Sequence, residues 1–377
     1  MENFILDPSK WEDSKYIYLG PIDLKNRGCP LISKGFFSMS CQQREEINDV
    51  FDNYYRYLES WNYEYDNNNE EMEELAPGKT IFFMSRNQDS PNLFHGGSEF
   101  INAICIMYLL NLKPEDIKII FLESIAINND PYDELYKNVL SRGGEPIHIK
   151  NLKKKYHIKS AVHVPINWDS PCFIQYQAPT CKYPTKTYQL FNYLVNRYMK
   201  IEPFKDSFVN DNKSYYPKST IEYYKSRKRF KKSLTFIWRR VWPPGRKGQY
   251  RILGNGPELV EKLTTFIPKN ILIRLIDTAA FPLRTQIALA RVTDYFYGIH
   301  GAGFTLSIFS PPHCIIHEVL PSNQLLLYMA SLSGHQFYSD NIKTEKRDVD
   351  GNQNIFINEE DFARNIMLRM KDSHFLD

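Results

Sequence analysis

No segment of the sequence is apolar over a length that predicts a membrane span. The most apolar run, Phe100 to Leu112, is interrupted by Asn102 and is shorter than the ~20 residues that a spanning helix needs. The first thirty residues carry charges throughout and have the character of neither a signal peptide nor an anchor. We expect the protein either to be soluble or to depend on a targeting segment outside this chain.

Several short motifs of metal binding and hydrolysis are also missing. None of the six cysteines forms a CxxC pair, no HExxH is present, and no GxSxG supplies the nucleophile of an ester hydrolase. These absences argue against a zinc site and against a serine hydrolase. Cys172 and Cys181 flank a loop-like stretch and would pair in an oxidising compartment, but two reduced thiols are an equally good interpretation.

Charge of one sign is not in excess either. The 377 residues include 47 Lys and Arg against 44 Asp and Glu, and the net charge of +3 is too small to indicate nucleic acid as the main partner. Apolar residues make up 42% of the chain and charged residues 24%, which is ordinary for a globular protein. This balance leaves room for a small anionic ligand held by a local basic site.

Short apolar segments alternate with helical patterns along the chain. In the first half, strands are predicted at 80–84, 117–122, 147–149 and 161–164, with helices at 98–112, 132–140 and 188–199. In the second half, strands are predicted at 234–238, 271–276, 295–299 and 315–320, with helices at 257–266, 282–291, 303–309, 324–332 and 358–370. This alternation predicts an α/β protein with two Rossmann-like halves. The basic run from Lys225 to Lys232 predicts a solvated connector, so we place domains at 1–228 and 229–377.

The segment from Gly298 to Gly303 reads GIHGAG and lies between a predicted strand and a predicted short helix. In a parallel α/β domain this is the carboxyl end of a strand, where ligands bind. The glycines allow a phosphate to approach the backbone, and the start of the following helix favours an anion. A tight turn that needs glycine at positive φ is an equally good interpretation.

Arginines follow the first strand of the same half. Arg239 and Arg240 end that strand, and Arg251 comes soon after. Sheet topology can bring these cations beside the GIHGAG segment, where the planar fork of arginine suits a phosphate. Taken alone, the pattern is better interpreted as a solvated basic loop.

In the first half, the segment from Asn92 to Glu99 follows a predicted strand and enters a helix. His95 and Glu99 share one helical face if the helix begins near His95, and together they could form an acid/base pair. A helix start with an exposed glutamate is the alternative. The DxD triplet at 348–350 lies in a polar, charged stretch, so we expect it to be accidental.

In their order along the chain, these segments resemble glycosyltransferase family 61. The matching features are a strand ending in arginine (236–240), an Arg-Ile-Leu turn with a helix (251–260), a Gln-containing helix (284–287), HGAG (300–303), a Pro-Pro turn (311–312) and a strand ending in glutamate (315–318). Asn92-x-x-His95-x-x-x-Glu99 is similar to the family's Asn-x-x-His-x-x-x-Asp, with Glu in place of the usual Asp. Leu306 stands where relatives commonly carry Asn or His.

The resemblance implies a GT-B fold, in which an acceptor-side domain and a nucleotide-sugar-binding domain face a central cleft. It implies an inverting transferase that moves N-acetylglucosamine or xylose from a UDP-sugar to a hydroxyl of a glycoprotein or glycan, with no obligatory metal or other cofactor. The predicted donor contacts are Arg239, Arg240 and Arg251 on the nucleotide or diphosphate, His300, Gly301, Ala302, Gly303 and Thr305 around the phosphates, and Glu318 on the ribose. Glu99 is the predicted base, His95 orients it or the acceptor, and Asn92 lies on the acceptor side.

The resemblance also implies the lumen of the endoplasmic reticulum or Golgi as the location. Neither nucleic acid nor a visible membrane attachment is expected. A catalytically inactive nucleotide- or carbohydrate-binding protein on the same fold is the alternative, which a donor-hydrolysis assay distinguishes. A metal-dependent transferase is a third interpretation, which would require divalent ions for donor binding.

Overall fold

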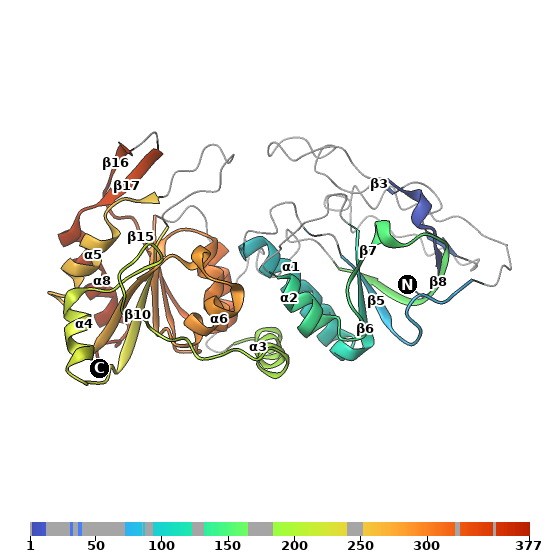
Figure 1. Cartoon of the computed structure of the whole chain (residues 1–377), viewed down its shortest axis with the longest axis horizontal. Helices are drawn as coiled ribbons and strands as arrows, with labels where there is room; N and C mark the ends of the chain where they lie inside the picture. Colours follow the sequence, from blue (N-terminus) through green and yellow to red (C-terminus); the bar gives the residue numbers. More distant parts are fainter. Residues whose placement is uncertain are drawn as a thin grey trace. The chain divides into compact units, whose positions relative to one another are not determined.

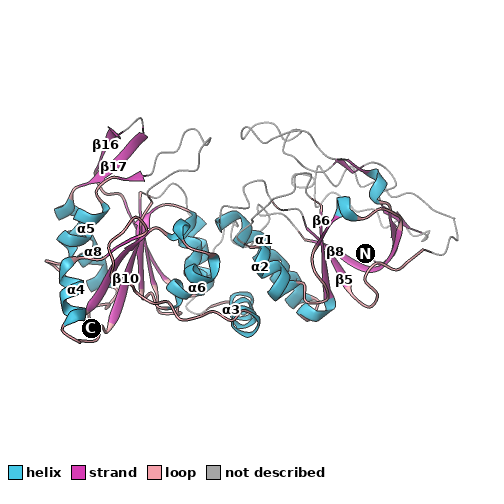
Figure 2. Cartoon of the chain, in the orientation of Figure 1, coloured by secondary structure: helices cyan, strands magenta, loops and turns pink. Residues whose placement is uncertain are grey.

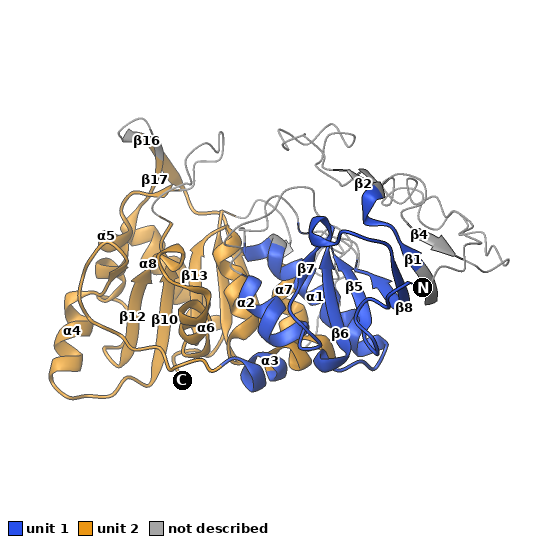
Figure 3. Ribbon diagram, turned by 45° about the vertical axis from the view of Figure 1, so that its right-hand side comes forward, with its two compact units in different colours: residues 1–173, 193–199 blue, residues 174–192, 200–377 orange. Residues whose placement is uncertain are grey.

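The computed structural model describes residues 2–12, 31–32, 37–39, 72–84, 86, 93–122, 132–164, 184–239, 252–320, 325–349 and 352–377 (Figure 1). The chain divides into two compact units, residues 1–173 with 193–199 and residues 174–192 with 200–377 (Figure 3). The predicted boundary between residues 228 and 229 lies within the second unit. In the described ranges, no helix is both long and apolar enough to cross a membrane.

The sheet of the first unit is built around two short apolar strands. β5 (Thr80–Met84) and β6 (Ile117–Phe121) are almost wholly buried, as parallel strands covered on both faces require. The sheet order is β4-β1-β8-β5-β6-β7, and β1 runs antiparallel to both of its neighbours. The other strands are β4 (Phe37–Met39), β1 (Glu2–Leu6), β8 (Tyr156–His163) and β7 (Ile147–His148).

Helix α1 (Leu93–Leu109) follows β5 and buries Phe100, Ile104 and Met107. Among the parallel strands, chain order reverses between β5 and β8, so the carboxyl ends of these two strands form a topological switch point. The remaining elements of this unit are η1 (Pro8–Lys10), the β2 (Trp11–Glu12) and β3 (Leu31–Ile32) pair, η3 (Pro114–Asp116), α2 (Asp133–Leu135) with the π-helical turn η4 (Tyr136–Leu140), and η5 (Ile149–Asn151).

The second unit has a larger sheet in the order β15-β14-β13-β10-β12-β9. All neighbours pair in parallel except β9, which is antiparallel to β12. The parallel strands, numbered along the chain, therefore stand in the doubly wound order 2-1-3-4-5, with the switch point between β10 and β13. The strands are β9 (Ser214–Tyr215), β10 (Lys232–Ile237), β12 (Ile271–Ile276), β13 (Tyr295–Ile299), β14 (Ile315–Val319) and β15 (Gln336–Asp340).

Helices cover both faces of this sheet, with α5 and α8 on one side and α6 on the other (Figure 2). The core beneath α5 and α8 includes Leu234, Phe236 and Tyr297 from the sheet and Leu259 and Phe362 from the helices. The helical elements are α3 (Lys186–Tyr198), within which the division between units falls, α4 (Lys218–Lys225), α5 (Gly256–Leu263), η8 (Thr278–Ala280), α6 (Leu283–Arg291), η9 (Ala302–Phe309), α7 (Leu325–Ser333) and α8 (Glu359–Asp372).

A small sheet packs beside this core, in the order β11-β17-β16. It consists of β11 (Ile252–Leu253), β16 (Thr344–Val349) and β17 (Asn352–Ile357). The chain then enters α8, where Asn358 caps the helix, because its Oδ1 accepts hydrogen bonds from the backbone N–H of Glu360 and Asp361, each at 3.0 Å.

The α/β class predicted from the sequence is confirmed. The strands predicted at 80–84, 271–276 and 295–299 coincide with β5, β12 and β13. Helix α1 begins at Leu93 rather than at residue 98. Its first turns were not predicted because Gly96 and Gly97 have low helix propensity. β8 begins at Tyr156 rather than at residue 161, since its first half, YHIK, has only one buried apolar side chain and forms no apolar run.

Candidate functional site

Two strand ends meet at the switch point of the second unit. β10 leads into Trp238 and Arg239, and its neighbour β13 leads into His300. Arg239 Nη1 donates a hydrogen bond to the carbonyl oxygen of His300 over 3.1 Å. The predicted approach of a post-strand arginine to the GIHGAG segment is therefore present in the structure, whereas Arg240 and Arg251 lie outside the described residues.

The glycines of this segment provide space rather than a left-handed backbone. Gly301 has a φ of 169°, which is extended backbone open to any residue. A Cβ at Gly301 would lie 2.8 Å from Arg239 Nη1, and a Cβ at Gly303 would lie 3.0 Å from Ile237 Cγ2. The alternative interpretation of a tight turn at positive φ is therefore wrong for Gly301, and close approach of neighbouring groups is the reason for glycine there.

The element that follows Gly301 is a 3₁₀ helix, η9, held in place by contacts from helix α3 and from the connection between α7 and β15. His335 Nε2 lies 2.7 Å from the carbonyl oxygen of Ser307, and Asn192 Nδ2 donates to the carbonyl oxygen of Ile308 over 2.8 Å. Phe191 packs edge-on against Phe309 at a centroid distance of 5.2 Å. These contacts fix the second half of η9, from Ser307 to Phe309.

Two residues of η9 that the sequence singled out are buried. Thr305 is 2% exposed, and its hydroxyl has no hydrogen-bond partner within the described part of the chain. Leu306 is 1% exposed and therefore contributes to the core. The phosphate role predicted for Thr305 stays a prediction, as do those of Ala302 and Gly303.

Glu318 and His300 contact each other at the ends of adjacent strands. Register pairs Gly298 of β13 with Glu318 of β14, and His300 Nδ1 contacts Glu318 Oε1. The Glu318 side chain is 0% exposed, while that of His300 is 12% exposed. The sequence suggested no such pair, because it depends on the β13–β14 register. The ribose role of Glu318 stays a prediction.

The neighbouring residue His317 points to the opposite face of the sheet and lies in a hydrogen-bonded network. Its Nδ1 lies 2.8 Å from the Tyr295 hydroxyl, and its Nε2 lies 2.8 Å from Asp340 Oδ2. Arg369 donates to both oxygens of Asp340, at 2.9 and 2.6 Å. Hydrogen bonds from Arg369 and His317 hold the pKa of Asp340 far below its usual range, and burial lowers the pKa of His317.

In the first unit, Glu99 lies on α1 and is 2% exposed. His95 lies one turn earlier on the same helix, as the acid/base interpretation requires, although its side chain is outside the described set. Glu99 is buried, so the alternative of an exposed helix-start glutamate is wrong. Asn92 lies outside the described residues, as do Cys172, Cys181 and Asp350.

One polar residue at the switch point of the first unit was missed. His163 ends β8 and pairs in register with Phe83 near the end of β5. Burial lowers its pKa to about 4, so the imidazole is neutral near pH 7. A histidine within the short apolar run at 161–164 was the signal in the sequence that could have identified it.

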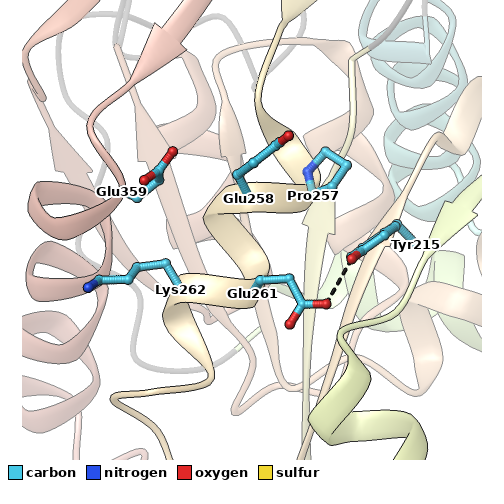
Figure 4. Close-up of a pocket in the computed structure, with 6 residues that line it drawn as sticks. All are labelled: Tyr215, Pro257, Glu258, Glu261, Lys262 and Glu359. Atoms are coloured by element: carbon cyan, nitrogen blue, oxygen red, sulfur yellow. Dashed lines mark hydrogen bonds between the residues drawn. The ribbon is translucent and has the colours of Figure 1, made fainter.

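A surface pocket of about 410 Å³ lies elsewhere on the second unit and contains none of the predicted site residues (Figure 4). It is lined by Tyr215, Pro257, Glu258, Glu261, Lys262 and Glu359. Tyr215 donates to Glu261 Oε1 over 2.8 Å, and burial together with this bond raises the pKa of Tyr215 to about 12. Three glutamates make this pocket a poor match for an anionic donor.

Among the described residues, no group of three or more His, Cys, Asp or Glu side chains is arranged to hold a metal ion. Asp348 lies on β16, opposite Gln353 of β17, within a hairpin.

Comparison with protein families gives one match. The family model described as Glycosyltransferase 61 matches residues 93–317. This range begins at the first residue of α1 and contains both Glu99 and the GIHGAG segment. No curated protein matches the chain.

Proposed function

The chain belongs to glycosyltransferase family 61, and from this we propose that it is an inverting, metal-independent glycosyltransferase. It moves a sugar, N-acetylglucosamine or xylose, from a UDP-sugar to a hydroxyl of a glycoprotein or glycan, in the lumen of the endoplasmic reticulum or Golgi. The second unit binds the donor, and the first supplies the acceptor side.

The observation that carries this proposal is the contact of Arg239 with His300 at the switch point between β10 and β13. Open α/β sheets bind ligands at this position, outside the carboxyl ends of the strands. A guanidinium and a backbone kept open by glycine suit a diphosphate, because arginine donates two parallel hydrogen bonds to phosphate oxygens.

The chemistry then requires little more than charge stabilisation and one base. The acceptor oxygen forms a bond to the anomeric carbon while the bond from that carbon to the diphosphate breaks on the opposite face. The departing UDP gains negative charge, which Arg239 and the donors of the GIHGAG segment stabilise without a metal. Glu99 takes the proton of the acceptor hydroxyl, and His95 orients it or the acceptor.

This mechanism fits a GT-B arrangement, in which the two Rossmann-like units face a cleft. Support comes from the parallel sheet of each unit and from the switch point in each. In such an arrangement the base and the diphosphate site come from different units, which places attack and departure on opposite faces of the sugar.

Binding of UDP-N-acetylglucosamine and UDP-xylose in the presence of EDTA tests the donor site. We expect either nucleotide sugar to raise the melting temperature of the protein without divalent ions. Stabilisation that requires Mg²⁺ or Mn²⁺ would contradict metal independence and favour the metal-dependent transferase. No stabilisation under either condition would contradict the donor class.

Replacement Glu99→Gln separates a transferase from an inactive binding protein. We expect donor affinity to persist and turnover to fall by on the order of 10²–10⁴, the usual contribution of a positioned base. The measurement is release of UDP from the donor, with and without acceptor, on the same preparation used for binding. Turnover within a few-fold of the wild type would move the role to His95, and no turnover by the wild type would favour the binding protein.

A further inference from the structure

The carboxylate of Glu318 is buried beside the segment where we propose that the diphosphate binds. A negative charge at this position would repel the diphosphate. Its side chain is 0% exposed, and Oε2 has no hydrogen-bond partner among the described residues. Oε1 contacts Nδ1 of His300. A buried carboxylate is costly unless it is paired, so its contact with His300 has an energetic reason.

We propose that Glu318 is a positioning residue, which holds the His300 imidazole by Nδ1 so that Nε2 donates a hydrogen bond to the diphosphate of the nucleotide sugar. The inference rests on the proposed function, because it takes the donor to lie against the GIHGAG segment. Nδ1 and Nε2 lie on opposite edges of the ring, so a carboxylate fixed at Nδ1 determines where Nε2 points.

The number of protons that His300 and Glu318 share explains why a carboxylate at Nδ1 suits a diphosphate site. With a single proton, on Nδ1, the pair carries one negative charge and Nε2 is an acceptor. With one proton more, the pair is neutral and Nε2 carries a hydrogen, whichever of the two residues holds the other proton. A diphosphate therefore favours the second state, in which Glu318 no longer opposes it.

Charged groups from the neighbouring elements face the same segment. Arg239, from the end of β10, donates to the His300 carbonyl oxygen and remains charged at every pH of interest. Glu318 reaches the ring from β14. Asp340, on β15, bonds His317 and points to the other face. Arg239 and the His300–Glu318 pair are therefore the charged and titratable groups from these elements that face the segment.

Two substitutions of His300 separate its two ring nitrogens. The amide nitrogen of glutamine lies near the place of Nε2, and that of asparagine lies near the place of Nδ1. We expect His300→Gln to keep affinity for UDP-N-acetylglucosamine and UDP-xylose within about tenfold of the wild type. We expect His300→Asn to lose about ten- to a hundredfold, the value of a hydrogen bond to a charged group. His374→Gln, at an exposed histidine, is the matched control.

The pH profile tests Glu318 itself. Nucleotide sugars are the probes, because their diphosphate does not titrate near neutral pH as the terminal phosphate of UDP does. We expect the affinity for nucleotide sugars to fall as pH rises, because the pair needs its second proton to donate to the diphosphate. We expect Glu318→Gln to move this fall to lower pH, because an amide lacks the negative charge that favours the second proton. A role in packing alone would lower the melting temperature and leave the shape of the profile unchanged.

The outcomes are distinct. His300→Asn binding as well as or better than His300→Gln overturns the inference, and so does a pH profile that Glu318→Gln leaves unchanged. In both cases the wild type still binds the nucleotide sugars and the proposed function stands. A wild type that binds neither nucleotide sugar overturns the proposed function and, with it, the inference.

Discussion

Two histidine–carboxylate pairs lie on opposite faces of one sheet and differ in how completely the protein satisfies them. His317 and Glu318 are consecutive on β14, so their side chains point to opposite faces. On one face, both ring nitrogens of His317 are bonded, and Asp340 is held by Arg369 as well. On the other face, Glu318 keeps one oxygen without a partner among the described residues, and His300 is partly exposed.

This difference distinguishes a structural pair from a binding pair, although both pairs consist of a histidine and a carboxylate. A network whose donors and acceptors are all used has nothing left for a ligand, and its contribution is to stability. The second pair lies at a strand end, beside an arginine and a glycine that makes space, and Glu318 Oε2 has no hydrogen-bond partner among the described residues. We therefore assign the first pair, His317–Asp340, to the fold, whereas the second, His300–Glu318, belongs to the donor site that we propose.

Breaking the first pair should have the largest effect. Asp340→Ala removes the acceptor of two Arg369 N–H groups and of His317, and leaves the His317 ring nitrogen buried without its partner. We expect a loss of roughly 3–4 kcal/mol in the free energy of unfolding, within the range for buried ion pairs. Urea unfolding measures this, and affinity for UDP in the folded variant should remain that of the wild type. A loss of affinity without a loss of stability would reverse the assignment.

Acid should destabilise the fold around His335, because its imidazole is buried and protonation would bury a charge. Burial lowers the pKa of His335 from 6.5 to about 4, so the fold favours the neutral ring and the unfolded chain binds more protons between these values. The stability that His335 contributes is complete above about pH 6.5 and is lost as pH falls toward about 4, by roughly 3 kcal/mol. Unfolding at several pH values should show that His335→Gln loses less stability on acidification than His374→Gln. Equal losses of stability in the two variants would contradict the lowered pKa of His335.

The arginine beside the second pair is expected to act on affinity. Arg239→Ala should weaken UDP binding by roughly 1.5–3 kcal/mol, the value of a hydrogen bond to a charged group. Arg239→Lys should restore it only in part, because an ammonium lacks the planar fork. Calorimetric titration with UDP measures both. The control is Arg347→Ala, at an exposed arginine paired with Glu345. Wild-type affinity in Arg239→Ala would remove this residue from the site.

The sequence alone predicts most of the parallel strands of both sheets. It does not predict the antiparallel strands that are added to them or pack beside them. β13 is a continuous apolar run and β12 is interrupted only by Arg274, so their pattern identified them to the residue. The β16–β17 hairpin was missed because Thr344 to Val349 is largely charged and its pairing with Asn352 to Ile357 depends on contacts across the hairpin. The antiparallel addition of β1 to β8 was missed because it pairs segments that are far apart in the sequence.

The candidate site also has one contact that the sequence predicts and others that it does not. Topology alone predicts that the ends of neighbouring parallel strands meet, and Arg239 does reach His300. The contact of His300 with Glu318 depends on the side-chain directions after β13 and on the β13–β14 register, neither of which a motif encodes. Burial of Thr305 and Leu306 depends on the packing of η9 against Asn192, Phe191 and His335, which are distant in the sequence.

The smallest expected effect comes from one methyl group at Gly301. Its φ of 169° suits alanine, so Gly301→Ala introduces no backbone strain. The added Cβ would lie 2.8 Å from Arg239 Nη1, at the far end of a flexible side chain, so the guanidinium moves rather than the fold. We expect UDP binding to weaken by about 1 kcal/mol, part of the value of the hydrogen bond that Arg239 makes, while the melting temperature stays unchanged. Titration with UDP in the Arg239→Ala background decides the cause, because the methyl group should then have no further effect. An equal loss in both backgrounds would mean that the methyl group meets the nucleotide itself, and the space at Gly301 would belong to the ligand rather than to the arginine.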